Sequence, residues 1–292
     1  MVDLHAHTTA SDGTLTPWEL VDLAAVKGVG VLGVTDHDTV AGIPGALERG
    51  EEEGVEIIPG IELGAKWNDA GQMHILGYHI DWQDRRLLDQ LSWLRGRRRE
   101  RAQRMVDRLN ELGVSVSWER VEELAGSGSI GRPHVARALL ESGHVRTISE
   151  AFSLYLSPGA PAYLEKVEFT PRGAMQLIRS SGGVPVLAHP ATLKLADSQL
   201  ETCLEGLVSE GLAGIEIYWA KHTAGERAAY GCLASRYNLV ATMGSDFHGA
   251  TKPGIDLGMG FTDEVDADQM LEGLSARRGR KLSAHEVAGD SA

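Results

Sequence analysis

The chain opens on a short apolar run that ends in two histidines, since residues 2–13 are VDLHAHTTASDG. Side chains two residues apart on a β-strand point to the same face. His5 and His7 can therefore present two imidazoles to one place at the end of the first strand. Several later apolar runs also end in histidine or carboxylate side chains. This recurrence indicates the fold more strongly than any single motif does.

Short apolar runs alternate with helical patterns in the first and last thirds of the chain. The expected strands are residues 2–4, 29–34, 55–61, 74–80, 184–187, 213–217 and 239–243. The first expected helix has Thr16 at its N-cap, Pro17 at N1 and Glu19 at N3, and it stops at Gly28. Seven strands, most of them followed by a helix, favour an α/β fold of parallel βα units closed into a barrel. An open doubly wound sheet is the alternative, but no glycine-rich phosphate loop follows the first strand.

A helical region interrupts this alternation. Residues 87–112 have helical spacing and are rich in arginine, and three shorter helical segments follow up to about residue 155. We expect a discontinuous barrel of residues 1–83 and 166–285, a helical insertion lobe of residues 84–165, and a tail of residues 286–292. On the arginine-rich helix, Arg97, Arg101, Arg104 and Arg108 share one face.

Composition excludes several classes of protein. The 292 residues include only two cysteines, which argues against a disulfide scaffold or a thiolate zinc ribbon. No apolar run reaches the ~18 residues of a membrane helix, and no export signal is visible, so we expect a cytoplasmic protein without a membrane partner. The net charge of −13 disfavours general nucleic-acid binding, unless bound metal ions invert the field locally.

The strand ends carry the residues that suggest chemistry. In barrel enzymes the reactive groups lie on loops after the C-terminal strand ends. Imidazole and carboxylate together suit Zn, Mn or Fe. The residues expected at five such ends are His5, His7, His37, Glu62, His189, Asp246 and His248.

At this point a family resemblance becomes specific. The segments HAHTTASDG (5–13) and TDHD (35–38) resemble the opening of the PHP (polymerase and histidinol phosphatase) superfamily. Segments PGIE (59–62), HILG (74–77), GRPH (131–134), AHP (188–190) and GSDFH (244–248) follow in the family's order. The chain looks most like the phosphoesterases that act on nucleoside 3′,5′-bisphosphates and short oligonucleotides.

The resemblance implies a distorted seven-stranded (βα)7 TIM-like barrel (the PHP fold) with two to three divalent ions, Mn, Fe or Zn. By motif, one ion takes His5, His7, Glu62 and Asp246. A second takes Glu62, His74 and His134, with Glu62 as the bridge. The third takes Asp12, His37 and His248. His134 would come from the helical insertion.

Three further residues are candidates for substrate and catalysis. His189 could ligate metal, bind phosphate or protonate the leaving oxygen. Arg132, two residues before His134, is the best candidate for a phosphate contact, because a guanidinium fork suits a phosphate group. His222 resembles a family segment that lines the substrate cleft. His79, His144 and His285 fit no motif, and we expect them to be surface or structural residues.

The resulting hypothesis is a metal-dependent phosphoesterase that cleaves a phosphomonoester of a small phosphorylated substrate with a metal-activated hydroxide. By the resemblance, we expect the bond cleaved to be that of the 3′-phosphate of nucleoside 3′,5′-bisphosphates, with short oligonucleotides as further substrates. Histidinol phosphate, or another small-molecule phosphate ester, is the alternative substrate. An amidohydrolase-type barrel also opens with HxH, but it would need a bridging lysine that we do not find at a mid-barrel strand end. A non-catalytic metal-binding module associated with a polymerase is the alternative of another class, and the complete set of ligand motifs disfavours it.

Overall fold

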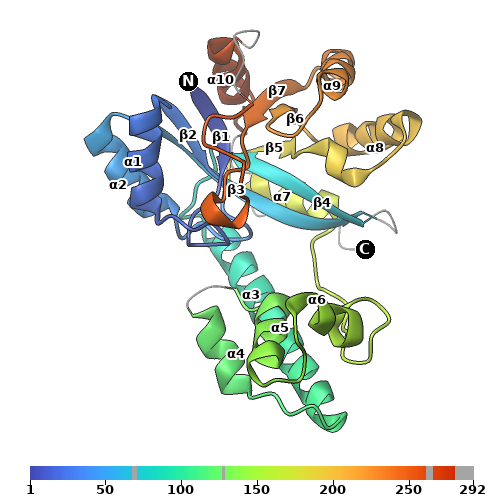
Figure 1. Cartoon of the computed structure of the whole chain (residues 1–292). Helices are drawn as coiled ribbons and strands as arrows, with labels where there is room; N and C mark the ends of the chain where they lie inside the picture. The colour runs from blue at the N-terminus through green and yellow to red at the C-terminus, as the bar shows by residue number, and fades with distance from the viewer. Residues whose placement is uncertain (68–70, 127–128, 261–265, 280–292) are drawn as a thin grey trace. The chain divides into compact units, whose positions relative to one another are not determined.

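The computed structural model describes residues 1–67, 71–126, 129–260 and 266–279. It divides into two compact units (Figure 1). One unit comprises Met1–Leu88 and Phe169–Ala292, and the other comprises Asp89–Glu168. The proposed tail, residues 286–292, lies outside the described residues. Within the described residues, no helix is both long and apolar enough to cross a membrane.

The first unit is built on a seven-stranded sheet whose spatial order equals the chain order in the described residues. Its strands are β1 (Val2–Ala6), β2 (Val31–Val34), β3 (Glu56–Trp67), β4 (Gly71–Tyr78), β5 (Val184–Leu187), β6 (Gly214–Trp219) and β7 (Val240–Gly244). Ala6 at the end of β1 forms a parallel bridge with Phe247, and the His7 amide donates to the Phe247 carbonyl at 2.9 Å. The sheet therefore nearly closes into a barrel, which confirms the α/β barrel and rejects the open sheet.

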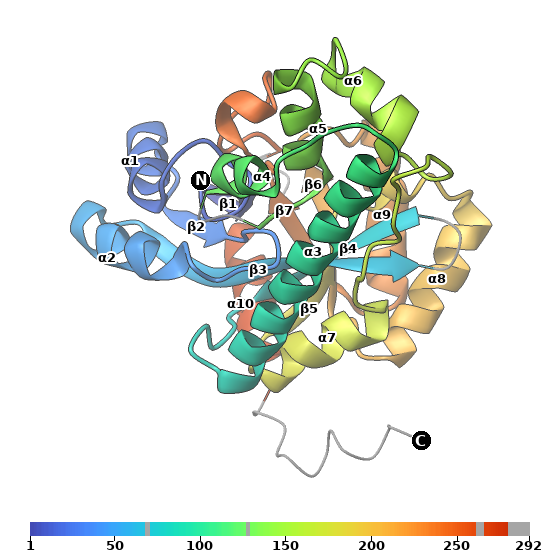
Figure 2. The ribbon, with the colours of Figure 1, turned by 90° about the horizontal axis from the view of Figure 1, so that it is seen from below.

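Helices cover the outside of the barrel (Figure 2). They are α1 (Pro17–Lys27), α2 (Ile43–Glu53), α7 (Pro171–Ser180), α8 (Asp197–Ser209), α9 (Ala224–Arg236) and α10 (Ala267–Ala276). The capping box expected at Thr16 and Glu19 is present, and Gly28 ends α1 with a left-handed φ of 72°. The helix signals in the sequence were therefore sufficient to place α1. Apolar side chains of the strands pack inside one core that includes Leu4, Leu76 and Val186.

The prediction that all strands run parallel is wrong for β4. This strand runs antiparallel to both β3 and β5, because it follows β3 after a few residues instead of after a helix. A direct connection can only return the chain antiparallel to the strand it leaves. The prediction that Glu62 ends its strand is also wrong, since β3 continues to Trp67. Reversal of β4 brings His74 to the same edge of the barrel as the C-terminal ends of the neighbouring strands.

The second unit is helical. It contains most of α3 (Arg85–Glu111), followed by α4 (Trp118–Ala125), α5 (Arg132–Glu141), α6 (Ile148–Ala151) and a π-helical turn (Phe152–Leu156). These helices share a core of their own, in which Met105, Leu109, Val135 and Leu139 are buried. A separate core is what allows this unit to be inserted between β4 and α7 without disturbing the barrel.

Candidate metal centre

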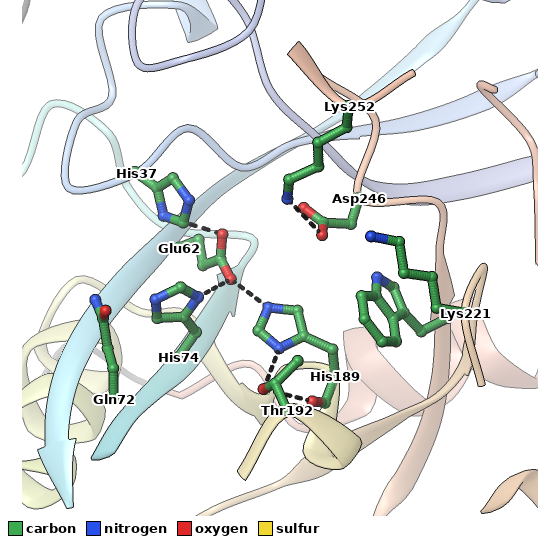
Figure 3. Close-up of a pocket in the computed structure, with 10 residues that line it drawn as sticks. His37, Glu62, Gln72, His74, His189, Thr192, Lys221, Asp246 and Lys252 are labelled. Atoms are coloured by element: carbon green, nitrogen blue, oxygen red, sulfur yellow. Dashed lines mark hydrogen bonds and ion pairs between the residues drawn. The ribbon is translucent and has the colours of Figure 1, made fainter. Parts of the chain in front are cut away.

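The carboxylate of Glu62 is completely buried at the centre of a group of imidazoles. Its Oε2 atom lies 3.3 Å from His5 Nε2, 3.2 Å from His7 Nε2 and 3.1 Å from His37 Nδ1. Its Oε1 atom lies 2.8 Å from His74 Nδ1 and 2.9 Å from His189 Nε2. Figure 3 shows three of these rings arranged around the carboxylate. Each oxygen thus faces its own set of nitrogen atoms, as a bridge between two cations requires.

Two aspartates extend this group. Asp246 Oδ1 lies 3.6 Å from His5 Nε2 and 3.4 Å from His7 Nε2. Asp12 Oδ1 lies 3.3 Å from His248 Nε2. The Nδ1 atom of His248 lies 2.9 Å from the carbonyl oxygen of Asp246, so Nδ1–H donates there and Nε2 is left with its lone pair. His248 is therefore held in the tautomer that a metal ligand needs.

These side chains form three overlapping groups whose ligand atoms lie within 4.8 Å of one another. The groups are His5, His7, Glu62 and Asp246; His7, Asp12, His37 and His248; and His37, Glu62 and His74. The structure thus brings together eight of the nine proposed ligands.

Several atoms in these groups that could ligate a metal have no hydrogen-bonding partner. Six of them are buried and make no hydrogen bond of acceptable geometry within the described part of the chain: His5 Nε2, His7 Nε2, Glu62 Oε2, His74 Nδ1, Asp246 Oδ1 and His248 Nε2. Buried polar groups are otherwise paired in folded proteins. Nitrogen and carboxylate donors in this combination fit a divalent transition metal. The cluster therefore fits metal binding.

The electrostatics of the cluster lead to the same conclusion. Burial opposes the charge of His5, but Glu216, Glu62 and Asp246 outweigh it and raise the pKa of His5 well above its usual value. Against the same burial, the neighbouring carboxylates of Asp246 and Glu62 raise the pKa of His7 to about 9. Burial opposes the charge of Glu62 as well, but His37, His74 and His5 lower its pKa well below the usual range. Without metal, protons on His5 and His7 balance the buried carboxylates, and metal binding has to displace them.

Glu216 was not among the residues singled out from the sequence. Its buried carboxylate lies 2.9 Å from His5 Nδ1 through Oε1 and accepts the backbone amide of His189 at 2.7 Å through Oε2. A carboxylate on the far nitrogen of a ligating histidine fixes its tautomer and orientation. A signal was present, because Glu216 is the only charged residue in the apolar strand GIEIYW. Periodicity alone does not say that such a residue faces the barrel interior.

The loop that carries Asp12 is held by Asp36, another carboxylate missed in the sequence. Asp36 accepts hydrogen bonds from the amide and hydroxyl of Thr8, both at 2.7 Å, and from Ser11 Oγ at 2.6 Å. These bonds fold residues 8–13 back toward the barrel. Asp36 therefore positions Asp12 without belonging to any of the three ligand groups.

His189 has an unusual backbone conformation, and its hydrogen bonds fix a ring proton on Nδ1. Its φ is 25°, which is rare for a residue other than glycine. The Thr192 hydroxyl donates to the His189 carbonyl at 2.9 Å, so it can only accept from His189 Nδ1, which lies 3.0 Å away. The proton on Nδ1 leaves Nε2 as the atom that faces Glu62.

Two of the sequence candidates lie in the helical unit. His134 Nδ1 accepts the Gly131 amide at 3.1 Å, and this hydrogen bond would have to break before the neutral ring could ligate a metal through either nitrogen. The Arg132 guanidinium donates to the Leu156 carbonyl at 3.2 Å and lies over the rings of Phe152 and Tyr163. The metal role of His134 and the phosphate contact of Arg132 stay predictions.

The shared arginine face of α3 has structural partners. Arg101 and Arg108 donate to the carbonyls of Leu164 and Tyr163, and Arg97 pairs with Glu100. These contacts account for three of the four arginines on that face, so the helix itself gives no indication of a phosphate site.

The remaining histidines of the described residues lie outside the ligand groups. His222 is buried between Trp219 and Tyr230, with Nδ1 2.8 Å from the Ile217 carbonyl, and its substrate contact stays a prediction. His79 has a left-handed φ of 55°, and exposed His144 bonds the Ser115 carbonyl. His285 lies outside the described residues.

A cavity of about 340 Å³ opens onto this centre. Its lining includes His37, Glu62, His74, His189 and Asp246. The remaining lining residues are Gln72, Thr192, Trp219, Lys221 and Lys252 (Figure 3). The cavity therefore combines a candidate metal centre with two cationic side chains.

Comparison with known proteins identifies the family. Residues 3–148 match the PHP domain family. The 5′-3′ exoribonuclease Rnm of Salmonella typhimurium is 36% identical over 88% of this chain and 87% of its own. A 3′,5′-nucleoside bisphosphate phosphatase of Chromobacterium violaceum is 32% identical over 88% of this chain and 90% of its own. A candidate metal-dependent phosphoesterase from Bifidobacterium adolescentis superposes with a TM-score of 0.76 at 32% identity, over 96% of both chains. The chain belongs to the PHP family.

We predict that the protein binds two to three divalent transition-metal ions per chain, because three ligand groups overlap at His7, His37 and Glu62. Elemental analysis of gently purified protein should find Mn, Fe or Zn near that ratio. A content below one ion per chain that reconstitution cannot raise would contradict the assignment.

We also predict that Glu216→Gln weakens metal binding about 10- to 100-fold, as loss of an outer-shell partner does elsewhere. A glutamine offers one acceptor oxygen, whereas the His5 ring and the His189 amide each require one. Competition with a chelator measures the apparent Kd. Glu48→Gln, on an exposed position of α2, is the matched control. An unchanged Kd in Glu216→Gln would show that Glu216 does not orient His5.

Proposed function

We propose that the protein hydrolyses the 3′-phosphate of nucleoside 3′,5′-bisphosphates and also acts on short oligonucleotides. The observation that carries the proposal is the buried Glu62 carboxylate, whose two oxygens face separate sets of imidazoles beneath an open cavity. The relatives named above act on nucleotide phosphate esters. A phosphate ester is therefore the substrate class that both the site and the family support.

The residues that would hold the metals are those of the three ligand groups, with His134 as a further candidate. Bound divalent ions supply a nucleophile at neutral pH and neutralise charge on a phosphoryl group. In the overall reaction a water oxygen bonds to phosphorus, the bond from phosphorus to the leaving oxygen breaks, and that oxygen gains a proton. Glu62 would contribute negative charge toward holding the cations, and Arg132 would contact substrate phosphate.

His189 is the candidate general acid. Its Nδ1 proton is engaged by Thr192, so Nε2 is the nitrogen that can hold or release a proton at the centre. That nitrogen is 2.9 Å from Glu62 Oε1, and the residue lines the cavity. The same position would also allow His189 to ligate metal or bind phosphate.

Two other functions remain as alternatives. Histidinol phosphate carries a single phosphate and would need no cation for a second one. A non-catalytic metal-binding module would need no open route to the metals, whereas here a cavity reaches Glu62. Assays of the metal-loaded protein with bisphosphate, monophosphate and histidinol phosphate separate all three possibilities.

We predict that Glu62→Gln abolishes hydrolysis and leaves the fold intact, because the amide keeps the shape of the side chain and loses the bridging charge. The kcat should fall by more than tenfold, which corresponds to a barrier raised by at least ~1.4 kcal/mol. Circular dichroism should be unchanged. His144→Ala is the control, since His144 is exposed and lies in the other unit. A kcat above a tenth of the wild-type value would exclude the assigned role of Glu62.

We further predict that a 3′-monophosphate is hydrolysed with a kcat/KM roughly 10- to 100-fold below that of the bisphosphate. Charge-assisted contacts to a second phosphate contribute ~1.5–3 kcal/mol each and would orient the ester over the metals. Arg132→Ala should reduce this discrimination between the two substrates.

The outcome of that comparison also tests the role of Arg132. An equal loss on both substrates would mean that Arg132 serves the reacting phosphate instead. Equal rates on bisphosphate, monophosphate and histidinol phosphate would show that no second phosphate is recognised, and the function would reduce to that of a general PHP phosphoesterase.

A further inference from the structure

Lys252 lies at the wall of the cavity, one residue after the short helix Gly249–Thr251 that follows β7. Its ammonium nitrogen is 2.8 Å from Asp246 Oδ2. The other oxygen, Asp246 Oδ1, is the one that faces His5 and His7. Lys252 therefore stands beside the ligand group of Asp246 without competing for its donor atoms.

We propose that Lys252 is a catalytic residue that donates a hydrogen bond to a nonbridging oxygen of the reacting phosphate. This inference rests on the proposed function, since it assumes that a phosphate ester enters the cavity. Neither the ligand motifs of the sequence nor the overlapping ligand groups include Lys252. Its position is defined only by the folded loop.

The Lys252 ammonium group has N–H donors that Asp246 does not use. A protonated lysine carries three N–H donors. Asp246 Oδ2 is the single partner of Lys252 Nζ within the described residues, and the side chain is one-third exposed, at 33%. Figure 3 shows Lys252 reaching Asp246 on the side of the cavity opposite Gln72 and His74. An anion bound over the metals would meet the remaining donors of this ammonium.

The loop holds the lysine in place before any substrate arrives. The Ala250 amide donates to Thr14 Oγ1 at 3.0 Å, and Thr251 Oγ1 donates to the His248 carbonyl at 3.1 Å. Gly249 has a φ of 66°, and a side chain there would overlap the Thr14 hydroxyl. The loop with Lys252 is thus fastened to the loop that carries Asp12. A preorganised donor is the arrangement that stabilises charge in a transition state most effectively.

Lys221 provides a useful contrast in the same cavity. It lies in the segment after β6, is exposed, and has its ammonium 5.6 Å from the centre of the Trp219 ring. No carboxylate pairs with it among the residues that the structure describes. Lys221 has the charge of Lys252 but lacks its fixed position next to a ligand group. The two lysines therefore separate the effect of charge in the cavity from the effect of a placed donor.

The test replaces Lys252 with methionine, which keeps the length of the stem and removes the charge. In metal-loaded protein, Lys252→Met should keep the wild-type metal content and bind inorganic phosphate about 10-fold more weakly by calorimetry. Its kcat/KM should fall about 10- to 100-fold, equally for a nucleoside 3′,5′-bisphosphate and a 3′-monophosphate. Lys252→Arg should recover most of the phosphate binding.

Two further variants complete the set. Lys27→Met removes the same charge at an exposed pair with Asp256, outside the cavity lining, and should match wild type. Lys221→Met should change kcat by less than Lys252→Met does, because Lys221 has no fixed contact at the centre.

Three results would overturn the proposal. Loss of metal from Lys252→Met would make the lysine a positioning residue for Asp246. A loss confined to the bisphosphate would assign it to the second phosphate. If Lys252→Met bound phosphate as tightly as wild type and kept the wild-type kcat/KM, Lys252 would have no role in the reaction. If the wild-type enzyme hydrolyses neither substrate, the proposed function fails, and phosphate binding alone then decides whether Lys252 contacts the anion.

Discussion

The structure depends on keeping one ionised carboxylate, that of Glu62, completely buried inside a barrel. Removing a charge from water costs several kcal/mol even after the surrounding protein relaxes. Five imidazoles around this carboxylate offset the cost, with nitrogen–oxygen distances between 2.8 and 3.3 Å. With imidazoles alone, several buried nitrogen and oxygen atoms of the cluster have no hydrogen-bonding partner. Divalent cations would satisfy those atoms, and the buried carboxylate is the main reason that the cluster fits metal binding.

The topology of the barrel places ligands from distant parts of the chain around that carboxylate. Near-closure of the sheet between β1 and the segment after β7 sets Asp246 beside His5, with the Asp246 amide donating to the His5 carbonyl at 2.8 Å. The antiparallel turn into β4 sets His74 against Glu62 from the neighbouring strand. A fully parallel sheet would have carried His74 to the other edge. The antiparallel strand β4 therefore positions one residue of the candidate metal centre.

Local sequence signals predicted much of this architecture. Caps, apolar runs and the ordered motifs indicate the barrel, the helical insertion and the residues that gather at Glu62. These local signals did not predict the direction of each strand or the contacts between side chains of distant strands. Nothing near Gly71 states that β4 must reverse, and a single glutamate in β6 does not reveal that Glu216 supports both His5 and His189. Lys252 has no motif at all, because its placement comes from bonds between the loops that follow β1 and β7.

The central claim is that Glu62 bridges metal ions, and diffraction from crystals of Mn-loaded protein tests it most directly. Anomalous scattering at the manganese edge should show one ion on the His5 and His7 side of Glu62 and another on the His74 side, each ligated by a different carboxylate oxygen. Full loading with no anomalous peak within ligand distance of Glu62 would contradict the account, and the buried carboxylate would then have a purely structural role.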